Sequence, residues 1–430
     1  MSKHQRGGGR LLVAGVVLVL VLSLGASVGE AKPTAKRDQT TLTVLLESPV
    51  QTTWNALVAN FQRVYPNISF QVSWVPSNTQ MYSELTTELS AGNGPDLLWT
   101  TAGNGTPISV TPLGKDGYLL PLVKQPWLKR TAPLVTSLDK VGKTLYAFTP
   151  GVGFYGLMVN NTLFAQLGLK VPTTFGQLLE TCKQASAKGT APFLLPGSSG
   201  SPVSTLIMQL ATTTEYAQDP NFNSEMEDGK VTFAGSAGWQ EALQEFIDMN
   251  SAGCFPAGSA GNNTTNVYNQ FANGQGLMFS ANSPLISTIH SLNPSLDFSF
   301  VPFPNGRTVA DDRTMEYGAT SFAINAKSSQ TSAAETFIDF FARPDQNRFW
   351  ANTQGLMSQY DYQKGIVPST LSAFATQIKG NKAIVAPVIK WWNPNVSTAI
   401  NTDAIGLVTG QQTISQVLAA MDTAWAQGSD

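Results

Sequence analysis

The chain has 430 residues, of which 42% are apolar and 13% are charged, and its formal net charge is −2. This composition is typical of a folded protein, and a charge so close to zero provides no general attraction to nucleic acid or anionic lipid. The chain contains only 2 histidines, His4 and His290, so a catalytic centre or metal site built on histidine is not expected.

The N-terminus has the pattern of a secretory signal peptide. Three basic residues, Lys3, Arg6 and Arg10, precede an apolar run over residues 11–24, which small residues follow. The run is shorter than the roughly 20 residues that a membrane-spanning helix needs. We therefore predict a signal peptide over residues 1–31, then a polar linker over residues 32–40, and a mature protein outside the cytoplasmic membrane.

The first part of the mature chain alternates strand and helix patterns. Residues 41–46, 68–75 and 96–99 are rich in strand formers, and residues 54–64 and 81–91 have the apolar spacing of amphipathic helices. Gly92, Asn93 and Gly94 end the second helix. Such alternation predicts right-handed βαβ units and a parallel sheet.

A similar alternation returns later in the chain. Strand patterns lie at residues 157–160, 276–280, 298–302 and 319–324, and helix patterns lie at residues 174–188, 236–251, 267–273, 332–342 and 414–426. About 400 residues exceed what one hydrophobic core usually serves. Two α/β units of similar size therefore predict two lobes that face one cleft, where loops after the strands would hold a ligand.

Cys182 and Cys254 are the two cysteines of the chain. In an oxidising compartment an isolated pair favours a disulfide, although two buried free thiols remain the alternative. The two cysteines and the distant His290 lack the clustered spacing of a metal site. We expect no metal and no cofactor.

Several segments, in order along the chain, resemble one known family. They are residues 90–98 (SAGNGPDLL), 155–164 (YGLMVNNTLF), 171–178 (VPTTFGQL), 271–278 (FANGQGLM), and 318–324 followed by 333–341. Together they resemble the extracellular solute-binding proteins of bacterial ABC importers, specifically the sugar-binding family that includes maltose-binding protein. Each motif alone is weak, but their order behind a signal peptide is characteristic.

The resemblance implies a two-lobed α/β periplasmic-binding-protein fold, or Venus flytrap, with discontinuous lobes and a hinge. The first lobe is expected over residues 41–149 and 305–343, and the second over residues 150–304 and 344–430. It also implies a monomer that binds a carbohydrate without chemistry and delivers it to an ABC transporter permease, with no role for nucleic acid.

Three positions depart from the family pattern. Val159 stands where an aromatic residue is usual, and Asn282 begins a segment where a tryptophan is frequent. Ser27 occupies the place of the lipidated cysteine of Gram-positive relatives, which argues against a lipid anchor.

Sugar binding needs flat aromatic faces for C–H surfaces and a few polar groups for hydroxyls. Aromatic and polar residues at predicted strand ends and loops are therefore the candidate ligand contacts. They are Glu47, Ser48, Trp99, Thr101, Asn104, Phe154, Tyr155, Asn282, Tyr317, Gly318, Trp391 and Trp392. For Trp99 the alternative is a place in the core of its strand, and for Phe154 and Tyr155 it is hinge packing. The adjacent Trp391 and Trp392 cannot both be buried on one helical face, so one of them is expected to face a ligand or the cleft.

Two alternatives remain at this point. One is a secreted carbohydrate-active enzyme that would use two carboxylates, such as Glu47 and Glu316. The other is the same fold with a polyol, a glycerol phosphodiester or a polyamine as ligand. No nucleophile elbow, phosphate-binding loop or dinucleotide motif supports an enzyme, and residues 197–201 (GSSGS) are interpreted as a flexible loop.

Overall fold

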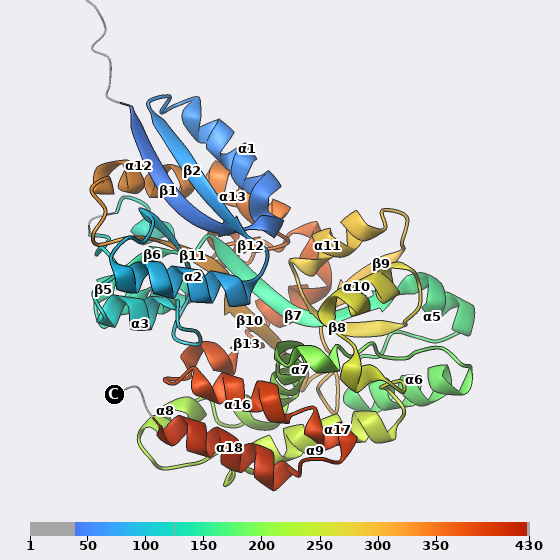
Figure 1. Cartoon of the computed structure of the whole chain (residues 1–430). Coiled ribbons are helices and arrows are strands. Elements are labelled where there is room, and N and C mark those ends of the chain that lie inside the picture. Colours follow the sequence, from blue (N-terminus) through green and yellow to red (C-terminus); the bar gives the residue numbers. More distant parts are fainter. Residues whose placement is uncertain (1–38, 124, 428–430) are drawn as a thin grey trace, which may run out of the picture. The chain divides into compact units, whose positions relative to one another are not determined.

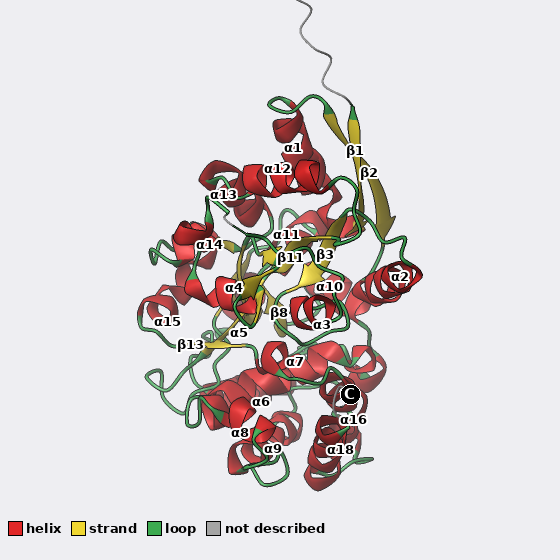
Figure 2. Ribbon diagram, turned by 90° about the vertical axis from the view of Figure 1, so that its left-hand side faces the viewer, coloured by secondary structure: helices red, strands yellow, loops and turns green. Residues whose placement is uncertain are grey.

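The computed structural model describes residues 39–123 and 125–427. The predicted signal peptide and nearly all of the predicted linker lie outside the described residues. Two large sheets, one two-stranded sheet and the helices around them make up the described chain, and the α/β fold class is confirmed (Figures 1 and 2).

The first sheet has the strand order β2-β1-β3-β11-β6. Its strands are β1 (Thr40–Glu47), β2 (Ile68–Val75), β3 (Leu97–Thr101), β6 (Ala147–Phe148) and β11 (Thr320–Ile324). β1 is parallel to β2 and β3, as the βαβ prediction requires, whereas β11 returns antiparallel to β3. A separate short hairpin joins β4 (Lys140–Val141) and β5 (Thr144–Leu145).

Aromatic residues from distant segments form the core of this first lobe. Trp54 of α1 (Gln51–Gln62) stacks on Phe322 of β11, with the ring centroids 6.1 Å apart. Its ring centroid also lies 5.3 Å from that of Phe337 of α12 (Thr331–Phe341). In Figure 2, α1 and α12 lie on one side of β1 and β2, and α2 (Asn78–Ala91) lies on the other. α3 (Val110–Lys115) also belongs to this lobe, whereas α4 (Pro133–Leu138) packs its Val135 among residues of the second lobe such as Phe154.

The second sheet is organised around one long strand, β7 (Gly151–Asn160), which begins directly after Pro150. The first half of β7 pairs with β10 and β12, and its second half pairs with β8 and β9. The order β12-β7-β10-β13 completes this sheet. Its strands are β8 (Met278–Asn282), β9 (Phe298–Val301), β10 (Thr314–Gly318), β12 (Met357–Ser358) and β13 (Ala383–Val385).

Helices surround this second sheet. They are α5 (Asn161–Leu167), α6 (Phe175–Ala187), α7 (Ser201–Ala211), α8 (Phe222–Glu227), α9 (Ala237–Ser251), α10 (Thr264–Ala272), α11 (Leu285–Leu292), α14 (Gln359–Tyr362), α15 (Ala375–Lys379), α16 (Asn395–Asp403), α17 (Gly406–Thr409) and α18 (Ile414–Ala426). The sequence-based helices at α6, α9, α10, α12 and α18 are confirmed within a few residues. The interpretation of residues 197–201 as a loop missed α7, which begins at Ser201 and is buried along most of its length.

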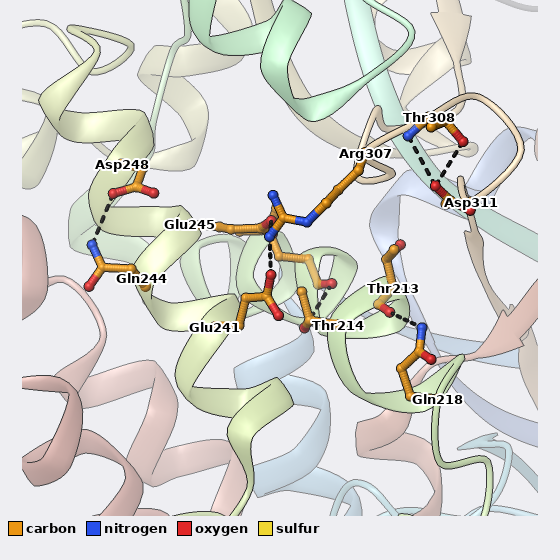
Figure 3. A network of polar contacts seen from close by, with 11 residues as sticks. Thr213, Thr214, Gln218, Glu241, Gln244, Glu245, Asp248, Arg307, Thr308 and Asp311 are labelled. Carbon is orange, nitrogen blue, oxygen red and sulfur yellow. Dashed lines mark hydrogen bonds and ion pairs between the residues drawn. The ribbon is translucent and has the colours of Figure 1, made fainter.

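The return to the first sheet comes later than the sequence-based boundary at residue 305. Asn305 donates its side-chain amide to the Gln209 carbonyl at 2.6 Å, and Arg307 forms an ion pair with Glu241 of α9 (Figure 3). β10 then pairs within the second sheet, so the chain crosses at Ala319. The contacts of residues 305–318 therefore assign them to the second lobe.

The final crossing also lies further along the chain than residue 344. Trp350 of α13 (Pro344–Thr353) packs on Phe341 at 5.2 Å within the first-lobe core. β12 then joins the second sheet from Met357. The contacts thus assign α13 to the first lobe and place this crossing near Leu356.

None of the helices within residues 39–123 and 125–427 combines the length and apolar character that crossing a bilayer requires.

Cys182 of α6 and Cys254 form a disulfide within the second lobe. Both side chains are fully buried, and the bridge closes a segment of 72 residues that includes α7 and α9. A bridge across such a segment restricts the unfolded chain, which in the chain-entropy view stabilises the fold.

Reduction of this disulfide should lower the free energy of unfolding by about 4 kcal/mol, because of the length of the segment it closes. Urea unfolding with and without dithiothreitol measures the effect. A Cys182→Ala/Cys254→Ala variant is the control, since the reductant should leave its unfolding curve unchanged. An unchanged curve for the wild-type protein would contradict a stabilising bridge.

Candidate functional site

Glu47 ends β1 at the side of the first sheet where β3 also ends. Burial raises the pKa of its carboxyl to about 7, and a hydrogen bond with the Trp99 side chain opposes the rise. Glu47 is therefore a partly buried carboxylate whose protonation changes near neutral pH.

Tyr82 lies near this carboxylate and near Tyr155, which in turn packs beside Tyr317. The ring centroids of Tyr155 on β7 and Tyr317 on β10 are 4.8 Å apart, with the ring planes tilted by 43°. The pKa of Tyr82 on α2 is raised to about 12, mainly by burial and in part by the charges of Glu47 and Tyr155. Tyr82 therefore lies near groups of both lobes. The phenols therefore stay neutral at physiological pH and offer both O–H donors and oxygen acceptors.

We call Glu47, Tyr82, Tyr155, Asn282 and Tyr317 the cleft cluster. Asn282 is the cross-strand partner of Tyr155 in the pairing of β7 with β8, so the two side chains share one face of the sheet. Its Oδ1 is buried and has no hydrogen-bond donor among the described residues. A buried acceptor of this kind is uncommon and suits a ligand hydroxyl or a water molecule.

Side-chain alternation keeps Phe154 out of the cleft cluster. Phe154 is fully buried on the face of β7 opposite Tyr155, and its ring packs at a tilt against that of Phe374, with the ring centroids 5.6 Å apart. Glu316 is the cross-strand partner of Phe154 and therefore shares that opposite face. It accepts a hydrogen bond from the Tyr362 hydroxyl at 2.8 Å, and burial raises its pKa to about 7.

Several predicted contacts hold local structure instead. The Ser48 hydroxyl donates to the Val75 carbonyl at 3.1 Å, and the Thr101 hydroxyl lies 2.7 Å from that of Ser109. Trp99 is 5% exposed and packs on Phe322 and Trp350 in the first-lobe core. These placements leave Ser48 and Thr101 with protein partners and make Trp99 a core residue beneath Glu47.

Gly318 and the two adjacent tryptophans also have packing roles. A Cβ atom on Gly318 would lie 2.9 Å from the Ala102 Cβ. Trp391 is fully buried and packs on Phe233 at 5.8 Å, while Trp392 is 37% exposed and rests on Trp425 of α18. The backbone carbonyl of Trp391 reaches the first lobe, where it accepts the Asn104 side-chain amide at 2.8 Å.

The structure thus brings together four of the predicted residues, Glu47, Tyr155, Asn282 and Tyr317, and adds Tyr82. The sequence offered a weak signal for Tyr82, an aromatic residue that directly follows the buried Met81 on an amphipathic helix. Ser283 lies beside Tyr317. Burial raises the pKa of Tyr317 well above its usual value, and a hydrogen bond with the Ser283 side chain lowers it in part. The described residues contain no cluster of three His, Cys, Asp or Glu side chains that would hold a metal ion.

Two acidic residues outside the cleft cluster, Asp96 and Asp312, have structural partners. Asp96 accepts hydrogen bonds from Thr43 and Ser328, and Asp312 accepts one from the Asn305 backbone at 3.1 Å. A cavity of about 580 Å³ near Glu215 and the start of α9 lies elsewhere in the second lobe and has none of the cleft cluster in its lining. Among the candidate acidic residues, Glu47 is the one whose carboxylate belongs to the cleft cluster.

Residues 47–348 match the family described as bacterial extracellular solute-binding protein. The multiple sugar-binding protein of Streptococcus mutans is 22% identical over 334 residues, which are 77% of each chain. Among solved structures, a chitin oligosaccharide binding protein has a TM-score of 0.77 at 18% identity and covers 91% of this chain and 99% of its own. RafE in complex with raffinose has a TM-score of 0.74 at 20% identity, with 90% and 99% covered. A sugar transporter protein from Bacillus licheniformis in complex with stachyose has a TM-score of 0.72 at 18% identity, with 90% and 100% covered.

The chain belongs to the bacterial extracellular solute-binding proteins, because the family match spans well over half of it. The structural similarities extend over about nine-tenths of the chain and confirm the two-lobed fold of this family.

Gly153→Ala should disturb the cleft cluster, because the added Cβ would lie 2.3 Å from the Tyr317 ring. We expect the free energy of unfolding to fall by about 1–3 kcal/mol, as for other overpacked sites, together with a changed near-ultraviolet circular dichroism signal. Gly176→Ala is the matched control, since its Cβ would meet no atom within 4 Å. Equal stability of the two variants would contradict the close packing of Tyr317 on Gly153.

Proposed function

We propose that the protein is an extracytoplasmic substrate-binding protein that captures a neutral carbohydrate in the cleft between its lobes and delivers it to the permease of an ABC importer. The cleft cluster is the observation that carries this proposal. It combines aromatic rings with neutral hydroxyl groups, one carboxylate and one unpartnered amide oxygen, and its members come from both lobes.

The chemistry of the cleft cluster favours a sugar over the rival ligands. Tyrosine rings suit the C–H face of a pyranose, while Glu47 and Asn282 accept hydrogen bonds from hydroxyl groups. A phosphodiester would require arginine or a similar anion site, and a polyamine would require several carboxylates. The cluster contains neither.

The relatives support the same ligand class. Two structural neighbours are complexes with raffinose and stachyose, and a third is a chitin oligosaccharide binding protein. The similar protein of Streptococcus mutans is a multiple sugar-binding protein. A tagatose-bound protein of Thermotoga lettingae with a TM-score of 0.75 extends this set to a single sugar. These similarities support a carbohydrate ligand and leave its length to experiment.

In the proposed mechanism, the sugar completes contacts with both lobes only when the cleft closes. Tyr82 and Glu47 would supply the first-lobe contacts, and Tyr155, Asn282 and Tyr317 those of the second lobe. Binding then shifts the open and closed populations by the difference in the sugar's affinity for the two states. Export by the predicted signal peptide would place this cycle outside the cytoplasmic membrane, where a permease receives the closed form.

A thermal-shift screen of the purified protein tests the ligand class. The screen contains raffinose, stachyose, chitin oligosaccharides and tagatose, with spermidine, glycerophosphocholine and sorbitol as the rival ligands. A ligand at 100 times its dissociation constant adds about 2.7 kcal/mol to the free energy of unfolding, which raises the melting temperature measurably. A response to sugars alone supports the proposal, and a response confined to a rival ligand contradicts it.

The affinity for a responding sugar should depend on pH through Glu47. The ionised carboxylate is the better acceptor for a sugar hydroxyl, and its pKa of about 7 means that Glu47 is mostly protonated at pH 6 and mostly ionised at pH 8. Binding should therefore tighten about tenfold between these two pH values. Isothermal titration calorimetry at both measures the change.

Glu47→Gln should bind more weakly at pH 8 and lose this pH dependence. Glu316→Gln is a matched control, because its carboxyl also has a pKa of about 7 but faces Tyr362 on the opposite side of the sheet. The Glu316→Gln variant should keep the wild-type profile. A Glu47→Gln protein that still binds tenfold more tightly at pH 8 would contradict the role of Glu47.

A further inference from the structure

A direct contact joins the two lobes outside the cleft cluster. It links the loop of Gly103, Asn104 and Gly105, which follows β3 in the first lobe, to residues 388–391 of the second lobe. The Asn104 backbone N–H donates to the Ile389 carbonyl at 2.8 Å, and its side-chain amide donates to the Trp391 carbonyl, also at 2.8 Å. Both bonds therefore join protein atoms of opposite lobes.

The glycines on either side of Asn104 permit this close approach. A Cβ on Gly103 would lie 2.5 Å from the Ile389 carbonyl oxygen, and one on Gly105 would lie 2.6 Å from the Val388 carbonyl oxygen. Gly103 also has a φ of +77°, which favours glycine. The sequence Gly-Asn-Gly thus allows backbone to meet backbone across the lobes.

Each side of the contact is anchored in its own lobe. In the first lobe, the Gly103 carbonyl accepts the N–H of Thr111 on α3 at 3.0 Å. In the second lobe, the Ala386 N–H donates to the Glu316 carbonyl of β10 at 2.7 Å, and the Trp391 indole is buried in the core. The lobes can therefore separate only if the hydrogen bonds of Asn104 to Ile389 and Trp391 break.

We propose that residues 103–105 and 388–391 form an interlobe latch that stabilises the closed state through the protein's own atoms, independently of the sugar. This inference deepens the proposed function, on which it rests. In the closed state, the stabilising free energies of the sugar contacts and of the latch then add. The strength of the latch sets the fraction of closed protein before binding, and through it the affinity and the rate of sugar release.

Two substitutions weaken the latch in different ways. Asn104→Ala removes the bond to the Trp391 carbonyl and keeps the backbone bond. Because one hydrogen bond of ordinary strength corresponds to about a fivefold change in an equilibrium constant, the ratio of closed to open protein should fall about fivefold. Gly105→Ala should lower the ratio further, since its Cβ would press against the Val388 carbonyl.

The distance between the lobes is the decisive measurement. Spin labels at Ser90→Cys on α2 and Thr398→Cys on α16 report it by double electron–electron resonance, because both positions are exposed and lie in different lobes. The native disulfide occupies both natural cysteines, so only the new ones take a label. Gly176→Ala, whose Cβ meets no neighbour, is the control.

Without sugar, Asn104→Ala and Gly105→Ala should each shift the distances toward longer values, while Gly176→Ala keeps the wild-type distribution. Identical distributions in all four proteins would overturn the latch, and melting curves verify that each variant is folded. Because this readout needs no ligand, it decides the latch even if the proposed sugar function fails.

Raffinose provides the second readout. If it binds, its dissociation should be faster from both latch variants, and an unchanged dissociation rate would count against the latch. Absence of binding by every sugar in the screen would contradict the proposed function instead.

Discussion

The alternation of side chains along β7 and β10 is the constraint on which the site depends. Tyr155 and Tyr317 share one face of the second sheet, and Phe154 and Glu316 share the other. A strand cannot present neighbouring residues to the same face, so a slip of one residue in register would exchange the cleft aromatics for core residues. Pairing of β7 with four strands holds this register, and Gly153 leaves room for the Tyr317 ring.

Buried carboxylates have different roles according to their partners. Asp139 accepts hydrogen bonds from Thr149 and Ser321 beside the first crossing between the lobes, and burial nevertheless raises its pKa to about 7. Glu316 has the Tyr362 hydroxyl as its partner. Glu47 lies at the end of β1 beside the tyrosines of both lobes. Burial thus raises the pKa of all three carboxyls to about 7, although Asp139 lies at a crossing between the lobes, Glu316 in a core and Glu47 in the candidate site. The neighbouring residues, and not the pKa, distinguish their roles.

Much of the fold could be predicted from the sequence because its signals are local. β2 has the predicted bounds, and β1, α6 and α18 differ from the predictions by one residue or less at each end. The boundaries between the lobes were less accessible. Neither β10 nor α13 was predicted, and only the pairing of β10 with β7 and the packing of Trp350 on Phe341 assign them to their lobes. α7 was missed because the glycines and serines before it resemble a loop.

The sequence by itself determined the fold class, the family and the kind of residue that a sugar site requires, since these follow from periodicity and from motifs of neighbouring residues. Tertiary structure alone decided which candidates meet. Trp391 is fully buried and Tyr82 joins the cleft cluster, although the sequence singled out the first and passed over the second. Strands and helices place residues by face, and which face borders the other lobe depends on contacts between segments far apart in the chain.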